Sequence, residues 1–276
     1  MSDSRAIGVF DSGLGGLTVV NELVRLMPNE RIIYLGDTAR VPYGGRSHET
    51  IRQYGLQDAR VLMEMDIKLL IVACNTVSSV ALDYLEQHIK DIPVIGVVLP
   101  GAKAAVLRTT GKKVGVIGTM ATVGSGSYAK AIQDIDPSIK VFGKACPLFV
   151  PLVEEGLLDH EITKLTVQYY LKELIDFGID CLVLGCTHYP LLTKVIQDTV
   201  SAGIQLLDSA LWTAKEAQDT LTKLNALAPD GIDGFASSRF MVSDLTSRFE
   251  SLAETLMGRR LPGIEKVSLD EIAAYQ

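Results

Sequence analysis

Short runs of apolar, often β-branched residues alternate along the chain with longer stretches whose apolar residues recur every three or four positions. Side chains repeat every two residues in a strand and about every 3.6 in a helix, so these patterns predict strands and helices respectively. The expected strands are 6–10, 31–35, 68–73, 93–98, 113–117, 140–142, 180–184 and 205–207. The expected helices include 14–27, 48–65, 77–88, 161–177 and 210–224.

Strands that alternate with helices are typical of parallel sheets wound with helices. The runs Leu69-Leu70-Ile71-Val72 and Leu182-Val183-Leu184 are apolar throughout, as expected of strands buried on both faces. We therefore predict an α/β fold.

Segments 70–76 and 181–188 resemble each other. Each is an apolar strand that ends in a cysteine, Cys74 or Cys186, followed by a threonine and a helical stretch. Ligands of wound α/β folds bind beyond the carboxyl ends of the strands. Both thiols are therefore expected in that kind of position.

The first thiol, Cys74, stands where a helix is expected to begin near Val77. The positive end of the helix dipole should lower the pKa of the thiol from about 8.5 and make it a usable base. Asn75 and Thr76 occupy expected N-cap positions and could hold a carboxylate. The structural alternative is a small buried side chain followed by two capping residues.

The second thiol, Cys186, is followed by His188, which could relay its proton near neutral pH. Pro190 fits the first turn of the next helix. His188 alone is more simply a structural histidine, but two similar units strengthen the catalytic interpretation.

Three other strand ends carry polar loops. Asp11 is a candidate to position a proton-transfer group, with an Asx cap as the alternative. The glycines at 13, 15 and 16 do not fit G-x-G-x-x-G, and no G-K-[ST] is present, which disfavours nucleotide binding. Segment 36–47 could be a surface connection, and the hydroxyls of 119–122 a helix cap.

Two opposed thiols suit one reaction class. Inversion of a carbon acid needs a base on one face of the carbon and an acid on the other. Contacts of about 3 to 3.5 Å on either side would set the two sulfurs roughly 6 to 7 Å apart. One sulfur must be a thiolate while the other keeps its proton, so the pair would titrate as a coupled unit.

The composition of the chain narrows the classes of protein and of binding partner that remain. The 276 residues are 47% hydrophobic and 21% charged, as in a soluble globular protein, and the formal charge of −7 disfavours nucleic acid or an anionic membrane as partner. No apolar run is long enough to span a membrane and no signal peptide is evident, so we expect a cytoplasmic protein. The four cysteines form no C-x-x-C, and only Cys186 and His188 could share a metal.

Six motifs follow one another within residues 6–256. They are Phe10-Asp11-Ser12-Gly13-Leu14-Gly15-Gly16, Asp37-Thr38-Ala39-Arg40-Val41-Pro42-Tyr43-Gly44, Ala73-Cys74-Asn75-Thr76, Gly118-Thr119-Met120-Ala121-Thr122-Val123, Gly185-Cys186-Thr187-His188-Tyr189-Pro190-Leu191 and Leu207-Asp208-Ser209-Ala210. In content and order they resemble the cofactor-independent glutamate racemases of the aspartate/glutamate racemase superfamily. The resemblance implies an α/β fold of two wound parallel-sheet domains with the active site in the cleft between them. The first domain would be discontinuous, 1–98 plus 208–276, and the second would be 99–207.

The resemblance also implies roles. Cys74 would remove the α-proton of D-glutamate with help from Asp11, and Cys186 that of L-glutamate with help from His188. Substrate would be held by Asp11, Ser12, Pro42, Tyr43, Gly44, Asn75, Thr76, Thr119, Thr122, Thr187 and His188. The family supplies D-glutamate for peptidoglycan, uses no pyridoxal phosphate, metal or nucleotide, and usually forms homodimers.

Three alternatives stay open at this point. An aspartate or hydantoin racemase of the same superfamily would differ in pocket size. A non-catalytic amino-acid-binding protein would share two lobes around a cleft. A zinc hydrolase would need a distant third ligand beside Cys186 and His188. The tail 258–276 carries no family signature.

Overall fold

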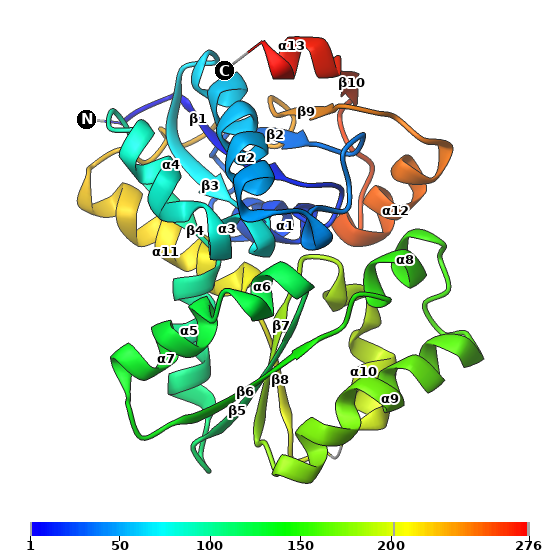
Figure 1. The fold of residues 1–276 in the computed structure, drawn as a ribbon. Coiled ribbons are helices and arrows are strands. Elements are labelled where there is room, and N and C mark those ends of the chain that lie inside the picture. The colour runs from blue at the N-terminus through cyan, green and yellow to red at the C-terminus, as the bar shows by residue number, and fades with distance from the viewer. Residues whose placement is uncertain (1, 201, 275–276) are drawn as a thin grey trace.

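The computed structural model describes residues 2–200 and 202–274, which build two parallel sheets flanked by helices (Figure 1). The strands are β1 (Ala6–Asp11), β2 (Ile32–Gly36), β3 (Ile67–Val72), β4 (Val94–Gly96), β5 (Lys113–Gly118), β6 (Lys140–Ala145), β7 (Cys181–Gly185), β8 (Gln205–Asp208), β9 (Arg239–Val242) and β10 (Glu265–Lys266). The larger sheet has the order β10-β9-β2-β1-β3-β4 and the smaller β6-β5-β7-β8. All these pairings are parallel, which confirms the predicted fold class.

Helices follow most strands. They are α1 (Leu17–Leu26), α2 (His48–Met63), α3 (Asn75–Val80), α4 (Leu82–His88), α5 (Val98–Arg108), α6 (Met120–Gly124), α7 (Ser127–Ile135), α8 (Phe149–Glu154), α9 (Glu161–Phe177), α10 (Thr193–Thr199), α11 (Ala210–Lys223), α12 (Ser247–Met257) and α13 (Leu269–Ala273). Two short 3₁₀ turns, η1 (Tyr43–Gly45) and η2 (Tyr189–Leu192), lie at strand-end loops. Within the described residues, no helix combines the length and apolar character needed to cross a membrane.

The expected strands are all present, with ends that differ by at most three residues. The single helix expected over 77–88 is wrong, because α3 and α4 meet at Ala81, whose backbone leaves helical geometry at φ −127°. Strands β9 and β10 were not predicted. β10 has only two residues, both exposed, so no apolar run marks it.

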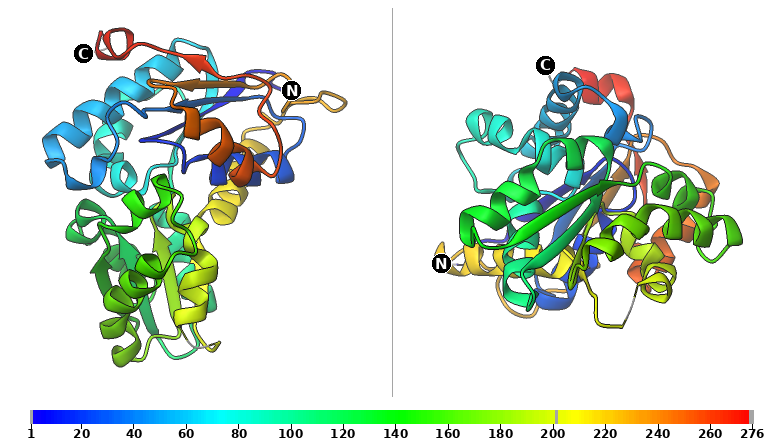
Figure 2. Two further views of the ribbon diagram at one scale, coloured as in Figure 1. Left: turned by 90° about the vertical axis from the view of Figure 1, so that its right-hand side faces the viewer. Right: turned by 60° about the horizontal axis from the view of Figure 1, so that its bottom comes forward.

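Alternating side chains divide the larger sheet between two cores. Ile7 and Val9 of β1 face α1, α11 and α12, whereas Ala6 and Phe10 face α2 and α3 on the other side. The larger sheet and its helices form one body of the molecule, and the smaller sheet and its helices form the other. The C-terminal tail belongs to the first body, since β10 extends the larger sheet and the fully buried Ile272 of α13 packs into the α2 core. Figure 2 shows α13 lying along α2 at the far end from the smaller sheet.

The chain passes between the two bodies twice, from β4 into α5 and from β8 into α11. The two passages are neighbours, because α5 contacts α11 and β8. Strands of the larger sheet come from 6–96 and 239–266, and those of the smaller from 113–208. The domain limits 1–98 plus 208–276 and 99–207 stay a prediction.

Candidate active site

A small cavity lies between the two bodies, where β1, β3, β5 and β7 end. Its lining residues are Ser12, Val41, Pro42, Tyr43, Gly44, Cys74, Asn75, Thr76, Thr119, Val150, Cys186, Thr187 and His188. Cys74 follows a strand of the larger sheet and Cys186 one of the smaller. The space amounts to about 20 Å³, room for about one water. The structure therefore shows the site closed, with less room than an amino acid occupies.

Eleven of the thirteen residues predicted from the sequence line this cavity. The other two, Asp11 and Thr122, lie directly behind the lining. The Thr187 hydroxyl donates to Asp11 Oδ1 at 3.2 Å, and the Thr122 hydroxyl lies 3.0 Å from that of Thr119. Thr119 also caps α6, because its hydroxyl accepts a hydrogen bond from the Thr122 N–H at 3.1 Å. One side chain therefore both caps this helix and lines the cavity.

The helix after Cys74 begins earlier than expected, and Cys74 itself is the N-cap residue. Asn75 and Thr76 are the first two helical residues rather than caps. The expected low pKa is also wrong: burial and the nearby Asp11 charge raise the pKa of the Cys74 thiol to about 12. Six residues of α3 give a weak dipole, and it does not offset the loss of water.

Polar contacts around Cys74 are few. Its Sγ lies 3.5 Å from Ser12 Oγ, the one side-chain hydrogen bond found for it in the described structure. Asp11 is fully buried behind Ser12, and its Oδ2 accepts from the Gly13 N–H at 3.0 Å. Burial raises the pKa of Asp11, although His188 and the hydrogen bonds oppose the shift.

The second thiol lies beside a cation. Burial disfavours the imidazolium of His188, but the neighbouring Cys186 and Glu154 side chains outweigh it and raise the pKa of His188 to about 10. Nε2 of this ring lies 3.3 Å from Glu154 Oε1 at the end of α8. Pro190 lies in the first turn after His188, as predicted, although that turn is the 3₁₀ turn η2.

The two bodies touch across the cavity at two glycines. A Cβ on Gly15 would lie 2.6 Å from the Thr187 carbonyl carbon, and one on Gly44 would lie 2.5 Å from Thr119 Cβ. Real side chains do not approach so closely, so the closed geometry requires glycine at both positions. A hydrogen bond of 3.0 Å between the Thr76 and Thr119 hydroxyls reinforces the contact.

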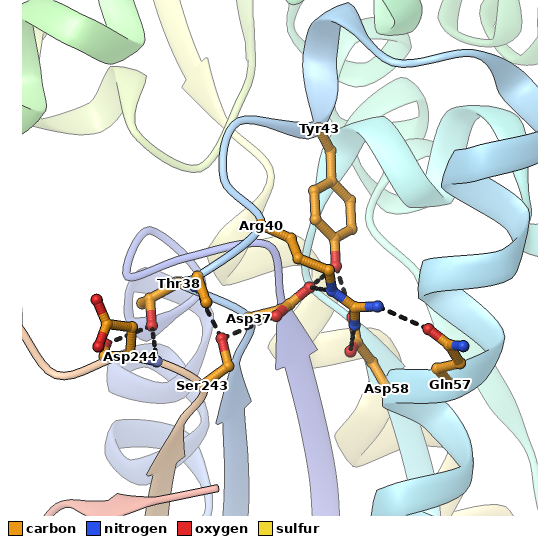
Figure 3. A network of polar contacts seen from close by, with 9 residues as sticks. Asp37, Thr38, Arg40, Tyr43, Gln57, Asp58, Ser243 and Asp244 are labelled. Carbon is orange, nitrogen blue, oxygen red and sulfur yellow. Dashed lines mark hydrogen bonds and ion pairs between the residues drawn. The ribbon is translucent and has the colours of Figure 1, made fainter. Parts of the chain in front are cut away.

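A buried polar network supports the loop that carries Tyr43 and Gly44 (Figure 3). The Tyr43 hydroxyl contacts both Asp37 and Asp58, and Arg40 bridges the same two carboxylates at 2.5 and 3.0 Å. Burial and the neighbouring Asp37 charge raise the pKa of Asp58 well above its usual value. The network thereby fixes one wall of the cavity to α2.

The same loop is fastened to the C-terminal part of the chain. The Ser243 hydroxyl donates to Asp37 Oδ1 at 2.8 Å and accepts from the Ala39 N–H at 2.8 Å. Thr38 and Asp244 are joined by two further hydrogen bonds, and Lys266 of β10 contacts Asp244 at 2.9 Å. Strand β9 and the tail therefore brace the cavity wall.

Sequence reasoning missed several contributors. Val41 and Val150 line the cavity, Glu154 contacts His188, and Tyr128 of α7 hydrogen-bonds Asn75. Val41 belongs to one of the six motifs but was not chosen as a site residue. Spacing offers no signal for Val150, Glu154 and Tyr128, because each reaches the site from a helix whose local pattern is ordinary. Throughout residues 2–200 and 202–274, no group of three or more His, Cys, Asp or Glu side chains is arranged to hold a metal ion.

Comparison with known proteins agrees with this site. Residues 7–217 match the family model Asp/Glu/Hydantoin racemase. The glutamate racemase of Chlorobaculum tepidum is 48% identical over 271 residues, covering 98% of each chain, and that of Geobacter metallireducens is 48% identical over 266 residues, covering 96% of this chain and 97% of the relative. The glutamate racemase of Francisella tularensis, solved with D-glutamate, superposes with a TM-score of 0.90 at 39% identity and covers 97% of this chain and 99% of its own.

The two-sheet fold and this similarity define an enzyme of the isomerase class, a racemase. More narrowly, the chain belongs to the Asp/Glu/Hydantoin racemase family.

Proposed function

We propose that this enzyme interconverts L- and D-glutamate by a two-base transfer between Cys74 and Cys186. The observation that supports it most is that the two thiols line one cavity from strands of different sheets. Relatives named glutamate racemase, 48% identical over nearly the whole chain, support the substrate.

In the direction from D- to L-glutamate, the Cys74 thiolate takes the α-proton from one face of the substrate. The electron pair stays on the α-carbon and its carboxylate, and the Cys186 thiol then delivers a proton to the opposite face. The enzyme is left with a Cys74 thiol and a Cys186 thiolate, and the reverse reaction restores the start. A thiolate whose conjugate acid has a pKa near 12 is an unusually strong base for a cysteine, which suits a weakly acidic α-proton.

Asp11 and His188 assist the two thiols. Asp11 is buried near Cys74 and would take part in setting the protonation of that thiol. His188 lies beside Cys186 at the cavity, and its imidazolium would stabilise the Cys186 thiolate. The different partners fit a pair in which one sulfur holds the proton while the other is charged.

Neutral donors would hold the substrate carboxylates. The hydroxyls and amides at the cavity come from Ser12, Asn75, Thr76, Thr119 and Thr187, with Thr122 behind Thr119. Asn75 and Thr187 are the residues we assign to the α-carboxylate. Negative charge that grows there during proton removal would be stabilised most in the closed, dry cavity.

The wider setting is proposed from the family resemblance. The product D-glutamate would serve peptidoglycan synthesis, the reaction would need no cofactor, and the enzyme would work in the cytoplasm as a homodimer. Neither nucleic acid nor a membrane is expected as partner, in keeping with the formal charge of −7.

The test is turnover of each enantiomer in deuterated water. A two-base racemase forms product that carries deuterium at the α-carbon, while recovered substrate gains much less, because each thiol serves one face. A non-catalytic binding protein would exchange no α-hydrogen. Parallel assays with aspartate and a hydantoin separate the sister activities, and loss of activity after chelation would support the zinc hydrolase instead.

A further inference from the structure

One hydrogen bond joins the two bodies directly behind the cavity. Tyr128 lies on α7, beside the smaller sheet, and its hydroxyl donates to Oδ1 of Asn75 on α3 at 2.6 Å. Both residues are almost completely buried, each about 2% exposed. The bond is therefore shielded from solvent, and it fixes which end of the Asn75 amide carries the oxygen.

The other end of that amide is unpaired. Asn75 Nδ2 is buried and has no hydrogen-bond partner among the described residues, yet Asn75 lines the cavity. An amide has one oxygen acceptor and two N–H donors. Buried donors left unpaired destabilise the folded state, so the arrangement is matched to a ligand that brings an acceptor, such as a carboxylate.

Tyr128 is itself firmly held. A Cβ added to Gly101 of α5 would lie 3.1 Å from its ring, and one added to Gly185, the residue before Cys186, would lie 3.3 Å away. The ring is therefore wedged between two stretches of backbone. Burial raises the pKa of the phenol, which keeps its proton available as a donor.

We propose that Tyr128 is a positioning residue, which orients the Asn75 amide so that its N–H groups face the substrate carboxylate. A half-turn of the amide would set its oxygen against the negative carboxylate instead, and the Tyr128 hydroxyl disfavours that orientation by occupying the oxygen. The inference rests on the proposed function, because it needs a carboxylate substrate in this cavity.

The bond has a second conceivable role as a plain tie between the two bodies. A tie needs the same hydrogen bond but works through closure as a whole, so its loss would act mainly by raising KM. A positioning residue acts on the proton-transfer step through the orientation of the amide, so its loss would lower kcat more than it raises KM. A double-mutant cycle shows whether Tyr128 acts through Asn75, and the split between kcat and KM separates the two roles.

The experiment measures racemisation of glutamate by Y128F, N75A and the double variant, with thermal unfolding of each. Tyr169→Phe is the matched control, because it removes the same atom from a side chain that is 74% exposed on α9. We expect Y128F to lower kcat/KM about tenfold, mainly through kcat, and N75A to lower it about a hundredfold. In the N75A background, Y128F should change kcat/KM less than about twofold, and the control should match the parent enzyme.

Each other outcome is decisive. The positioning role is wrong if Y128F lowers kcat/KM by the same factor with and without the Asn75 amide, or if Y128F alone has no effect. It is also wrong if the loss in Y128F lies in KM alone, which is the result expected of a plain tie. Asn75→Asp guards against a folding artefact: it keeps an oxygen for Tyr128 but presents a negative oxygen to the cavity, so binding of glutamate should fall more than a hundredfold in a folded protein. A folded parent enzyme that racemises no glutamate would overturn the proposed function itself.

Discussion

The strand end that carries Cys74 and the one that carries Cys186 share a sequence pattern but differ in the charges around the sulfur. Burial and the Asp11 carboxyl raise the pKa of Cys74 to about 12, which favours the neutral thiol. Beside Cys186, the neighbouring thiol and Glu154 overcome burial and raise the pKa of His188 to about 10, which favours the imidazolium form. Similar strands thus present to one cavity one sulfur beside a buried carboxyl and another beside a histidine whose pKa is raised. A reaction that must hold a single proton on one of two thiols gains from such unequal halves.

The largest loss of activity is expected when either side of the cavity, the Cys74 side or the Cys186 side, loses its sulfur. Cys74→Ser and Cys186→Ser should each lower racemisation by at least about a thousandfold, because a hydroxyl is a far weaker acid than a thiol. Cys181→Ala, a change at a buried cysteine in the core of the smaller sheet, is the control. Activity retained in either serine variant would show that one half suffices.

A smaller loss is expected from changes at the residues beside the two thiols, Asp11 near Cys74 and His188 near Cys186. The variants Asp11→Asn and His188→Asn replace each with a neutral amide. Each should lower kcat/KM by roughly a hundredfold. The enantiomers have equal free energy in solution, so kcat/KM must fall by the same factor in both directions. The halves are told apart by the primary deuterium isotope effect, which should grow from D-glutamate in Asp11→Asn and from L-glutamate in His188→Asn. The opposite assignment would exchange the roles of the two sides.

The two halves should also lose stability in different pH ranges. His188 has a raised pKa when folded, so its contribution is fully present below about pH 6.5 and is lost as the pH rises towards 10. The folded state likewise favours protonated Cys74, whose contribution is lost only between about pH 9 and 12. His188→Gln should remove the loss of stability that the parent protein shows between about pH 6.5 and 10. That loss amounts to several kcal/mol, at about 1.4 kcal/mol per pKa unit. Denaturant unfolding of parent and variant at pH 6 and pH 10 measures it, and equal differences at both values would contradict it.

A smaller effect is expected from the contacts that brace the loop 37–44 on the Cys74 side of the cavity. Ser243→Ala removes one hydrogen bond to Asp37 and one from Ala39, which should cost about 1–2 kcal/mol of stability and raise KM a few-fold. Ser237→Ala is the control, because the exposed Ser237 hydroxyl, in the same C-terminal part of the chain, donates to the Asp233 carbonyl instead. Unchanged KM with lowered stability would show that the brace does not reach the cavity.

Prediction from the sequence succeeded where a local pattern carries the information. Apolar runs located eight strands, and polar residues directly after those runs located the cavity, because parallel strands bring their carboxyl ends to one edge. The pKa of Cys74 was predicted in the wrong direction, since burial and the distance to Asp11 depend on tertiary packing rather than on helix position. Tyr128 and Glu154 escaped notice for the same reason, as each joins the site from a distant segment. The structure of the tail could not be predicted, because its strand β10 has only two residues. Its position is set by contacts with β9 and α2 rather than by a local sequence pattern.

The paired passages of the chain between the two bodies limit how the cleft can open. Two adjacent covalent connections, at β4–α5 and β8–α11, define a hinge axis. The bodies are therefore expected to open by rotation about this hinge and not by shear. Rotation about one axis brings Cys74 and Cys186 back to the same separation at every closing. A reaction that depends on two atoms meeting opposite sides of one carbon is thereby set up afresh, with the same alignment, in each turnover.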